Sequence, residues 1–415
     1  TLDARDYFTR GQDSRLLRAV RESYERLAAQ YEVIVIEGAG SAAEVNLRDR
    51  DLVNWTTVEL ADARVVLVGD IDRGGVFAQI VGTLDLIAAE ERARVCGIVI
   101  NKFRGDRTLF DEGVRFLTAR TGIPILGVLP YLRDLALDQE DSLDVGARAQ
   151  IPFTAERVNV AVLLLPHMSN FTDFNALAQE TDVALRYVAT PEAALGADVM
   201  ILPGSKTTLS DLAYLRERGF QSVLQDHVRR GGELVGVCGG YQMLGQSIAD
   251  PDGVETGGHD KGLELLPVTT VLARDKITEQ VEGQALHIEG STTLTVRGYL
   301  IHVGRTDRAG LRPCFQLVRR KTSLDGSTAI VRDEECLDGA VRHDGLVWGT
   351  YVHGLFDQPD FRRAWLNRLR SRKGLPAVAL EESHRVNDTR LNAMDRWADH
   401  VDRHLDLAPV LSWLR

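Results

Sequence analysis

The sequence of 415 residues has only four cysteines, at positions 96, 238, 314 and 336. No two of them form a Cys-x-x-Cys pair, so neither a disulfide framework nor a zinc ribbon is expected. The sequence also lacks an apolar run long enough to cross a bilayer and a basic-then-apolar leader. Basic residues are not in excess, because the formal net charge is -11 and the pI is near 5.5, whereas a nucleic-acid binder needs clustered Lys and Arg. We therefore expect a cytoplasmic protein that binds neither membranes nor nucleic acid.

Apolar residues make up 44% of the chain, and their spacing indicates two α/β domains. Residues 14–30 show helical spacing, and residues 31–37 form a β-branched run that predicts the first strand. The intervals between strands are long enough for crossover helices, which indicates a parallel, doubly wound sheet followed by a second α/β unit. The further strands are predicted at 64–69, 95–100, 124–129, 158–165, 197–202 and 232–237.

A polar, acidic stretch at 131–156 is the best candidate for a linker between the domains, and we place the boundary near Ala155. The predicted first domain is then 1–130 and the second is 157–360. Residues 361–415 are expected to form a helical segment packed on the second domain.

The strongest chemical signal is Gly236-Val-Cys-Gly-Gly240, which follows the predicted strand 232–237. A nucleophile on a sharp turn between strand and helix needs glycines on both sides, and the N–H groups at the helix start favour a thiolate. Cys238 is therefore the predicted nucleophile, and attack on the carboxamide of glutamine fits this geometry. The N–H groups of Gly239 and Gly204 form the predicted oxyanion site. A buried cysteine in a Gly-rich turn is the structural alternative.

A thiol nucleophile needs a base, and the sequence has ten histidines. His353 lies at the end of an apolar run in Gly349-Thr-Tyr-Val-His-Gly-Leu-Phe356, next to a glycine that permits close approach, and it is the predicted base. His302, in Gly298-Tyr-Leu-Ile-His-Val-Gly-Arg305, is the second candidate. For His302 we favour a packing role in a strand near the site.

These motifs resemble one known family. The elbow, Ile201-Leu-Pro-Gly-Ser-Lys-Thr207 and Gly349-Thr-Tyr-Val-His-Gly354 resemble the glutaminase domain of the cobyric acid synthase branch of amidotransferases. The resemblance runs from about Leu16 to the C-terminal helices. Four segments of the first half resemble the synthetase domain of the same family, which is similar to dethiobiotin synthetase: Glu37-Gly-Ala-Gly-Ser41, Glu44-Val-Asn-Leu47, Asp70-Ile-Asp-Arg-Gly-Gly-Val-Phe77 and Ile100-Asn-Lys-Phe-Arg-Gly-Asp106.

The resemblance implies a fold and an activity. The fold is a P-loop-NTPase-like parallel sheet followed by a class I glutamine amidotransferase-like, flavodoxin-like α/β domain. The activity is that of an ATP-dependent amidoligase, a glutamine-hydrolysing enzyme of cobalamin biosynthesis. It amidates the b, d, e and g carboxylates of adenosylcobyrinic acid a,c-diamide, so glutamine and a corrinoid acceptor are the expected partners. An acyl phosphate is the sensible intermediate, because a carboxylate is a poor electrophile until ATP activates it.

Phosphoryl transfer depends on positioning and on charge neutralisation, so carboxylates at strand ends are candidate Mg²⁺ ligands. Glu37 and Asp70 are the two candidates, with helix capping as the alternative role. Asp70, Arg73, Asn101 and Lys102 are the candidate contacts to ATP or substrate. Asn101 could equally form a turn, and the glycines after Arg73 could serve only to make one.

Two features depart from the pattern of the family. No Gly-x-x-x-x-Gly-Lys-Ser/Thr phosphate loop occurs, although the family carries one on its first strand and helix. Because the sequence begins at Thr1 in mid-pattern, we expect an upstream segment to be missing. Many related glutaminases also place a Glu two residues after the His, where this chain has Leu355. The third catalytic group is thus unassigned, Asp357 is interpreted as a surface carboxylate, and a Cys and His dyad would suffice.

Two other interpretations stay open. One is another two-domain amidoligase, such as cobyrinic acid a,c-diamide synthase or a cell-wall precursor amidotransferase. The other is a noncatalytic ATPase-like binding protein. The segments around Glu37 and Asp70 favour the cobyric acid branch, and the presence of both Cys238 and His353 argues against a noncatalytic protein. The sequence is also compatible with a homo-oligomer.

Overall fold

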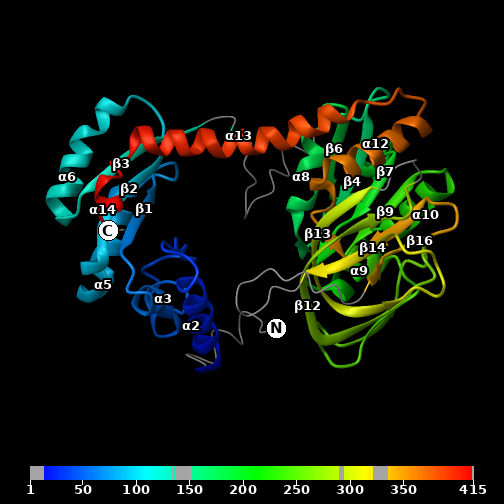
Figure 1. Cartoon of the computed structure of the whole chain (residues 1–415), viewed down its shortest axis with the longest axis horizontal. Helices are drawn as coiled ribbons and strands as arrows, with labels where there is room; N and C mark the ends of the chain where they lie inside the picture. Colours follow the sequence, from blue (N-terminus) through cyan, green and yellow to red (C-terminus); the bar gives the residue numbers. More distant parts are fainter. Residues whose placement is uncertain (1–13, 133–134, 136–150, 289–293, 321–334, 414–415) are drawn as a thin grey trace. The chain divides into compact units, whose positions relative to one another are not determined.

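The structure is a computed structural model that describes residues 14–132, 135, 151–288, 294–320 and 335–413 (Figure 1). The chain divides into two compact units. The division falls between Ala136 and Leu137, and again between Leu391 and Asn392. The first of these points lies inside the predicted linker 131–156, of which residues 133–134 and 136–150 are outside the described residues.

The first unit is built on a parallel sheet in the order β1-β2-β3. The strands are β1 (Val65–Asp70), β2 (Val95–Phe103) and β3 (Ile125–Pro130), close to three of the predicted runs. Apolar side chains of β2 and β3 pack on one face against α4 and α6. The helices of this part of the chain are α2 (Ser14–Ala28), η1 (Val45–Arg50), α3 (Trp55–Leu60), α4 (Val76–Leu86), α5 (Ala89–Arg94), η2 (Arg107–Phe110) and α6 (Asp111–Thr121).

The strand predicted at 31–37 does not form. This segment is irregular, Val35 is 93% exposed, and β1 pairs only with β2 among the described residues. A β-branched run becomes a strand only where a neighbour satisfies its N–H and C=O groups, and no described segment does so here. Glu37 therefore lies in exposed irregular chain and not at the end of a strand.

Helix α13 (Leu380–His404) is shared between the two units. From Asn392 onwards it belongs to the first unit, where Trp397, Val401 and Leu405 pack on the second face of the β1-β2-β3 sheet. Apolar residues four positions apart form a stripe that requires an apolar partner. The expectation that all of 361–415 packs on the second domain therefore does not hold for residues 392–413, which include α14 (Ala408–Ser412).

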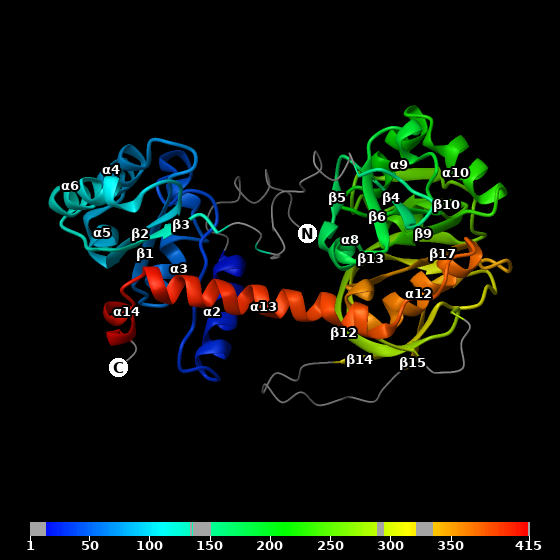
Figure 2. The same cartoon turned by 90° about the horizontal axis from the view of Figure 1, so that it is seen from above.

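The second unit contains a six-stranded sheet in the order β16-β17-β9-β7-β4-β6, parallel except for β16. Strands β4 (Val158–Leu163), β7 (Val199–Leu202) and β9 (Glu233–Val237) arise from predicted runs and are buried throughout, as parallel strands covered on both faces are. Figure 2 shows α9 and α10 on one face of this sheet and α12 on the other. The other elements are η3 (Phe171–Phe174), α8 (Asn175–Gln179), β6 (Val183–Val188), η4 (Glu192–Ala194), α9 (Thr208–Glu217), α10 (Phe220–Arg229), α11 (Gly239–Met243), β16 (Ala340–Val341), β17 (Val347–Thr350) and α12 (Pro359–Arg372).

A second, mostly antiparallel sheet of seven strands was not anticipated from the sequence. Its path is β11-β10-β12-β13-β18, and β14 joins β12 to β15. This sheet matters because β18 carries His353. The strands of this sheet are β10 (Ser247–Asp250), β11 (Gly258–Lys261), β12 (Thr269–Ala285), β13 (Thr295–Asp307), β14 (Phe315–Arg320), β15 (Glu335–Asp338) and β18 (Val352–His353), and a separate pair is β5 (Met168–Ser169) with β8 (Gly204–Ser205).

No helix in the described ranges is long and apolar enough to span a membrane.

Candidate active site

Cys238 lies on the sharp turn between β9 and α11, where the glycine pattern predicts it. Its φ of 52° and ψ of -111° fall in a region that residues with a side chain rarely adopt. A Cβ at Gly240 would lie 2.0 Å from the carbonyl oxygen of Leu202, and one at Gly236 would lie 2.7 Å from a backbone nitrogen of α11. The N–H of Cys238 donates to the carbonyl of Thr350 at 2.8 Å. The glycines are thus required for the turn, and β17 holds it.

His353 ends β18 in the same site, and its residue is 1% exposed. Burial lowers the pKa of His353, but the hydrogen bond with Asp173 and the interactions with Asp173 and the neighbouring Cys238 outweigh burial and raise it to about 10. Its Nε2 has no hydrogen-bond partner among the described residues, while the thiol of Cys238 donates to the carbonyl of Ile301 at 3.5 Å. This nitrogen is therefore available to exchange a proton with the sulfur or with a bound substrate.

Asp173 supplies the carboxylate that the sequence left unassigned. One of its oxygens, Oδ2, lies 2.7 Å from His353 Nδ1, and Oδ1 accepts the backbone N–H of Gly354 at 2.9 Å. Asp173 is 4% exposed and comes from η3, 180 residues before the histidine. The pairing fixes a proton on Nδ1 and leaves Nε2 to face the reaction, as in other nucleophile, histidine and acid triads.

The ring of His353 is also held by packing. The ring of Tyr299 stacks on it with centroids 5.3 Å apart at 18°, and Asn170 Nδ2 donates to the hydroxyl of Tyr299 at 2.8 Å. Asn170 is the residue before η3 and has a φ of 53°. The short turn that carries Asp173 thus also supports the second contact to the histidine.

A weak signal for Asp173 was present in the sequence. The segment Asn170-Phe-Thr-Asp-Phe174 follows the predicted strand at 158–165, and in parallel sheets functional groups gather beyond the carboxyl ends of strands. An acid between two aromatic residues at that edge is a candidate functional group. Its pairing with a residue so distant in sequence could not be read from spacing.

Gly204 and Gly239, the predicted oxyanion residues, lie in the same site as the cysteine and histidine. A Cβ at Gly239 would lie 2.9 Å from the backbone nitrogen of Ser205, and a Cβ at Gly204 would lie 3.4 Å from His353 Cε1. The loop that follows β7 is therefore in contact with both the elbow and the histidine. Helix α11 has five residues, so its dipole adds little to anion stabilisation.

His302 is placed on β13 next to Ile301, which accepts the thiol of Cys238. Its ring stacks on Tyr351 with centroids 3.8 Å apart at 16°, and burial lowers its pKa to about 4. A neutral, stacked ring fits the packing interpretation of His302.

In the first unit, Asp70 and Asn101 are paired across the ends of β1 and β2, and Lys102 follows directly. Lys102 Nζ lies 2.8 Å from Asp70 Oδ2, and this hydrogen bond lowers the pKa of Asp70. The φ of Lys102 is 60°, a strained value, and the Oδ1 of Asn101 accepts its N–H at 2.8 Å. Three of the four residues predicted to contact ATP or substrate are thus brought together at the carboxyl edge of the sheet.

Arg73 lies in the exposed turn between β1 and α4, where Gly74 and Gly75 both have positive φ. Glu37 is not placed at a strand end, as described above. No group of three or more His, Cys, Asp and Glu side chains in the described ranges could hold a metal ion by itself. Mg²⁺ bound with a nucleotide commonly takes only one or two carboxylates, and a single carboxylate at Asp70 fits that use.

The elbow, the paired histidine and the α/β sheet define the second unit as a glutamine amidotransferase. Residues 159–361 match the family of CobB/CobQ-like glutamine amidotransferase domains, and residues 8–139 match an AAA domain. The two matches confirm the predicted combination of a nucleotide-binding P-loop-like unit and an amidotransferase unit.

Two curated relatives identify a particular family within the class of glutamine amidotransferases. Cobyric acid synthase from Syntrophobacter fumaroxidans is 44% identical over 95% of this chain and 77% of its own length, and that from Citrobacter koseri is 47% identical over 95% and 76%. The chain belongs to the cobyric acid synthase family, which confirms the resemblance seen in its motifs. Among solved structures, PurLQS from Thermotoga maritima is similar only at a TM-score of 0.35 and 16% identity, over 57% of this chain and 99% of that one.

Proposed function

We propose that the chain is an ATP-dependent cobyric acid synthase that amidates the b, d, e and g carboxylates of adenosylcobyrinic acid a,c-diamide with ammonia taken from glutamine. The observation that carries the glutaminase half is the buried His353, whose Nδ1 is paired with Asp173 and whose Nε2 is unpaired beside the elbow of Cys238. The corrinoid acceptor is supported by relatives of this name along nearly the whole chain.

In the proposed glutaminase reaction, the thiol proton of Cys238 passes to His353 Nε2, where the raised pKa of the ring holds it, and the Cys238 thiolate attacks the carboxamide carbon of glutamine. The N–H groups of Gly239 and Gly204 stabilise the oxyanion. His353 then returns the proton to the leaving nitrogen, and ammonia departs from a thioester. Water, deprotonated by His353, hydrolyses the thioester to glutamate and regenerates the thiol. Asp173 stabilises the imidazolium in both halves of the cycle.

The synthetase reaction is assigned to the first unit. There we propose that ATP binds with Mg²⁺ beyond the ends of β1 and β2, with Asp70 as a carboxylate contact to the ion and with Arg73, Asn101 and Lys102 near the phosphates or the acceptor. When bound, Mg²⁺ neutralises charge on the phosphates. The acceptor carboxylate takes the γ-phosphoryl group and releases ADP, and ammonia then displaces phosphate to form the amide. Glu37 is left out because the strand that would place it is absent.

The test uses a form of the protein that carries a phosphate loop, incubates it with ATP, Mg²⁺, glutamine and cobyrinic acid a,c-diamide in its adenosylated form, and follows the corrinoid mass. Stepwise conversion to cobyric acid is expected. Cys238→Ala should abolish conversion with glutamine and retain it with ammonium chloride. An unchanged corrinoid in the presence of ammonia would exclude this acceptor and favour the other two-domain amidoligases.

A further inference from the structure

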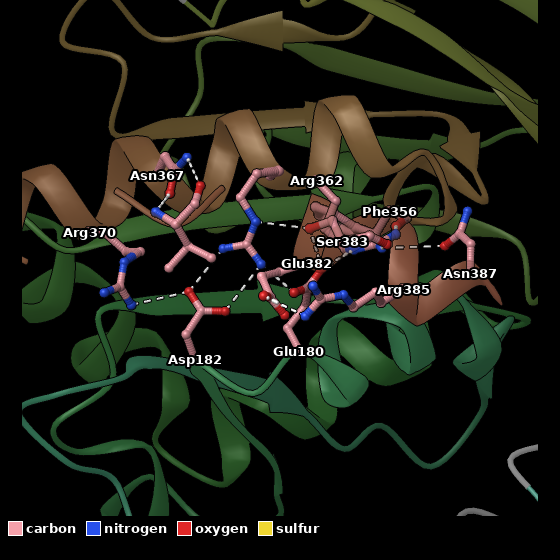
Figure 3. Close-up of polar contacts among 12 residues, drawn as sticks. Glu180, Asp182, Phe356, Arg362, Asn367, Arg370, Glu382, Ser383, Arg385 and Asn387 are labelled. Carbon is pink, nitrogen blue, oxygen red and sulfur yellow. Dashed lines mark hydrogen bonds and ion pairs between the residues drawn. The ribbon is translucent and has the colours of Figure 1, made fainter. Parts of the chain in front are cut away.

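Arg362 of α12 is 0% exposed, which is unusual for a side chain that stays charged. Its Nε donates to Glu180 Oε1 at 2.7 Å, Nη1 donates to the carbonyl of Phe356 at 2.5 Å, and Nη2 donates to the carbonyl of Ser383 at 2.7 Å. Figure 3 shows these groups converging on α12. A buried guanidinium with its donors satisfied in a rigid fork fixes the relative positions of everything that it contacts.

Two of the backbone carbonyls held in this region belong to the segment that follows His353. Arg362 binds the carbonyl of Phe356, and Asn387 Nδ2 of α13 donates to the carbonyl of Asp357 at 3.1 Å. Asn387 Oδ1 also accepts from Arg362 Nη2 at 3.3 Å. Phe356 and Asp357 lie in η5 (Leu355–Asp357), which starts two residues after the histidine. The amide of Asn387 therefore bridges the arginine and the segment.

The opposite side of the same segment is held by the proposed catalytic acid, because Asp173 accepts the N–H of Gly354. Residues 353–357 are thus clamped between the acid on one side and the Arg362 and Asn387 pair on the other. Gly354 has a φ of 70°, so the chain turns sharply between these two sets of contacts. Loosening either set would change the angle at which Nε2 faces Cys238.

The Arg362 and Asn387 contacts come from outside the matched amidotransferase domain, which ends at residue 361. Glu180 anchors them to the domain, because it accepts from Arg362 and from the hydroxyl of Ser383 at 2.5 Å. Arg363 adds ion pairs to Glu180 and to Asp182, the latter at 3.0 Å. The start of α13 is thereby fixed to the edge of the six-stranded sheet (Figure 3).

We propose that Arg362 and Asn387 are positioning residues of the glutaminase, which hold the main chain after His353 so that its Nε2 stays aligned with Cys238. This inference rests on the proposed role of His353 as the base. Misplacement of a catalytic group by about 1 Å can lower a rate about 100-fold, so a modest contact to this segment has a measurable effect on turnover.

The test uses Asn387→Ala with Asn367→Ala as a matched control. Asn367 is also half-buried, and its amide makes two hydrogen bonds of 2.9 Å to Val378, in the connection between α12 and α13. The two variants lose the same side chain and similar hydrogen bonds, but only Asn387 contacts the histidine segment. We expect Asn387→Ala to lower kcat for glutamine hydrolysis about tenfold or more with little change in KM, and Asn367→Ala to retain kcat.

Asn387→Asp separates the two contacts, because a carboxylate can still accept from Arg362 but cannot donate to the carbonyl of Asp357. It should lose kcat like the alanine variant. Inactivation of Cys238 by an electrophilic glutamine analogue should slow by the same factor, since it depends on the same alignment. Wild-type kcat in Asn387→Ala, or equal losses in the Asn387 and Asn367 variants, would overturn the proposal.

Failure of the proposed function gives a different result. If the wild-type protein neither hydrolyses glutamine nor is inactivated at Cys238 by the analogue, the glutaminase assignment itself is wrong. If the wild-type protein does both and Asn387→Ala does so equally well, only the positioning role is wrong.

Discussion

Replacing Asp173 by Asn tests the triad most directly, because the change keeps the shape of the side chain and removes its charge. Asp173 accepts two N–H groups, one from His353 Nδ1 and one from the backbone of Gly354. An asparagine has only one acceptor oxygen. If that oxygen faces Gly354, its NH₂ group faces His353 and forces the ring proton onto Nε2, which can then no longer accept the thiol proton.

The size of the effect follows from the interactions that are lost. A hydrogen bond to a charged group contributes about 1.5 to 3 kcal/mol, and a loss of about 3 kcal/mol lowers kcat about 10²-fold. The wrong tautomer of the histidine in such a triad lowers kcat by as much as about 10⁴-fold. We therefore expect kcat to fall about 10²- to 10⁴-fold.

The assay is glutamate release under saturating glutamine, with kcat and KM measured separately. Asp357→Asn is the matched control, since Asp357 is the acid nearest to His353 in the sequence after it. We expect Asp357→Asn to lose much less kcat than Asp173→Asn, and the KM of Asp173→Asn to change little. Wild-type kcat in Asp173→Asn, or a larger loss in Asp357→Asn, would refute the assignment of the acid.

The other predictions concern pH, the loop after β7 and the first unit. Because the pKa of folded His353 is about 10, above the ordinary 6.5, its stabilising contribution is complete below pH 6.5 and is lost as pH rises through 10. Urea unfolding should therefore show stability falling over that window, and less steeply in Asp173→Asn. Asp211→Asn should lower glutaminase kcat about tenfold, because this fully buried carboxylate accepts the Ser205 hydroxyl at 2.6 Å and so holds the loop of the proposed oxyanion site; unaltered kinetics would exclude that role. Lys102→Ala should abolish amidation driven by ammonia and leave glutamine hydrolysis intact, and an equal loss of both would contradict the separation of the two sites.

The elbow could be predicted because everything it needs is local. The run that ends at Val237 is apolar enough to form a buried strand, and the glycines at 236 and 240 permit the turn and the close approach of the neighbouring strand. These constraints act within a few residues and leave a pattern in the sequence. The same holds for β1 and β3, which lie one residue later than the predicted runs, and for β2, which starts at the predicted residue and ends three residues later.

The strand at 31–37 could not be judged from composition alone. Its Val and Ile residues have the propensity of a strand, but propensity describes how a side chain fits a sheet once the sheet is there. In this chain Val35 is almost fully exposed, and no described segment pairs with it. Whether a run has a ladder partner depends on the fold and not on the run.

The packing of the C-terminal helix could not be predicted for a similar reason. Its apolar stripe at Trp397 and Val401, which Leu405 continues just beyond the helix end, shows that the helix packs on something, but not on which sheet. Pairs such as Asn387 with Asp357 and Arg362 with Glu180 join segments that are far apart in sequence. Polar residues in a predicted helix are ordinarily expected to face solvent. Only the three-dimensional arrangement shows that Arg362 and Asn387 make hydrogen bonds inside the protein instead.

The departure at Leu355 can now be understood from packing. Many related glutaminases have a Glu at this position, two residues after the histidine. Here the position begins η5 and is 2% exposed within the main core of the second unit, where an ionised carboxylate without a partner would be strongly destabilised. The histidine still requires an acceptor at Nδ1, and the carboxylate that meets it comes from η3, before the cysteine in the chain. We propose that Asp173 has taken over the role of the Glu, since such triads are defined by the geometry of their groups and not by their order in sequence.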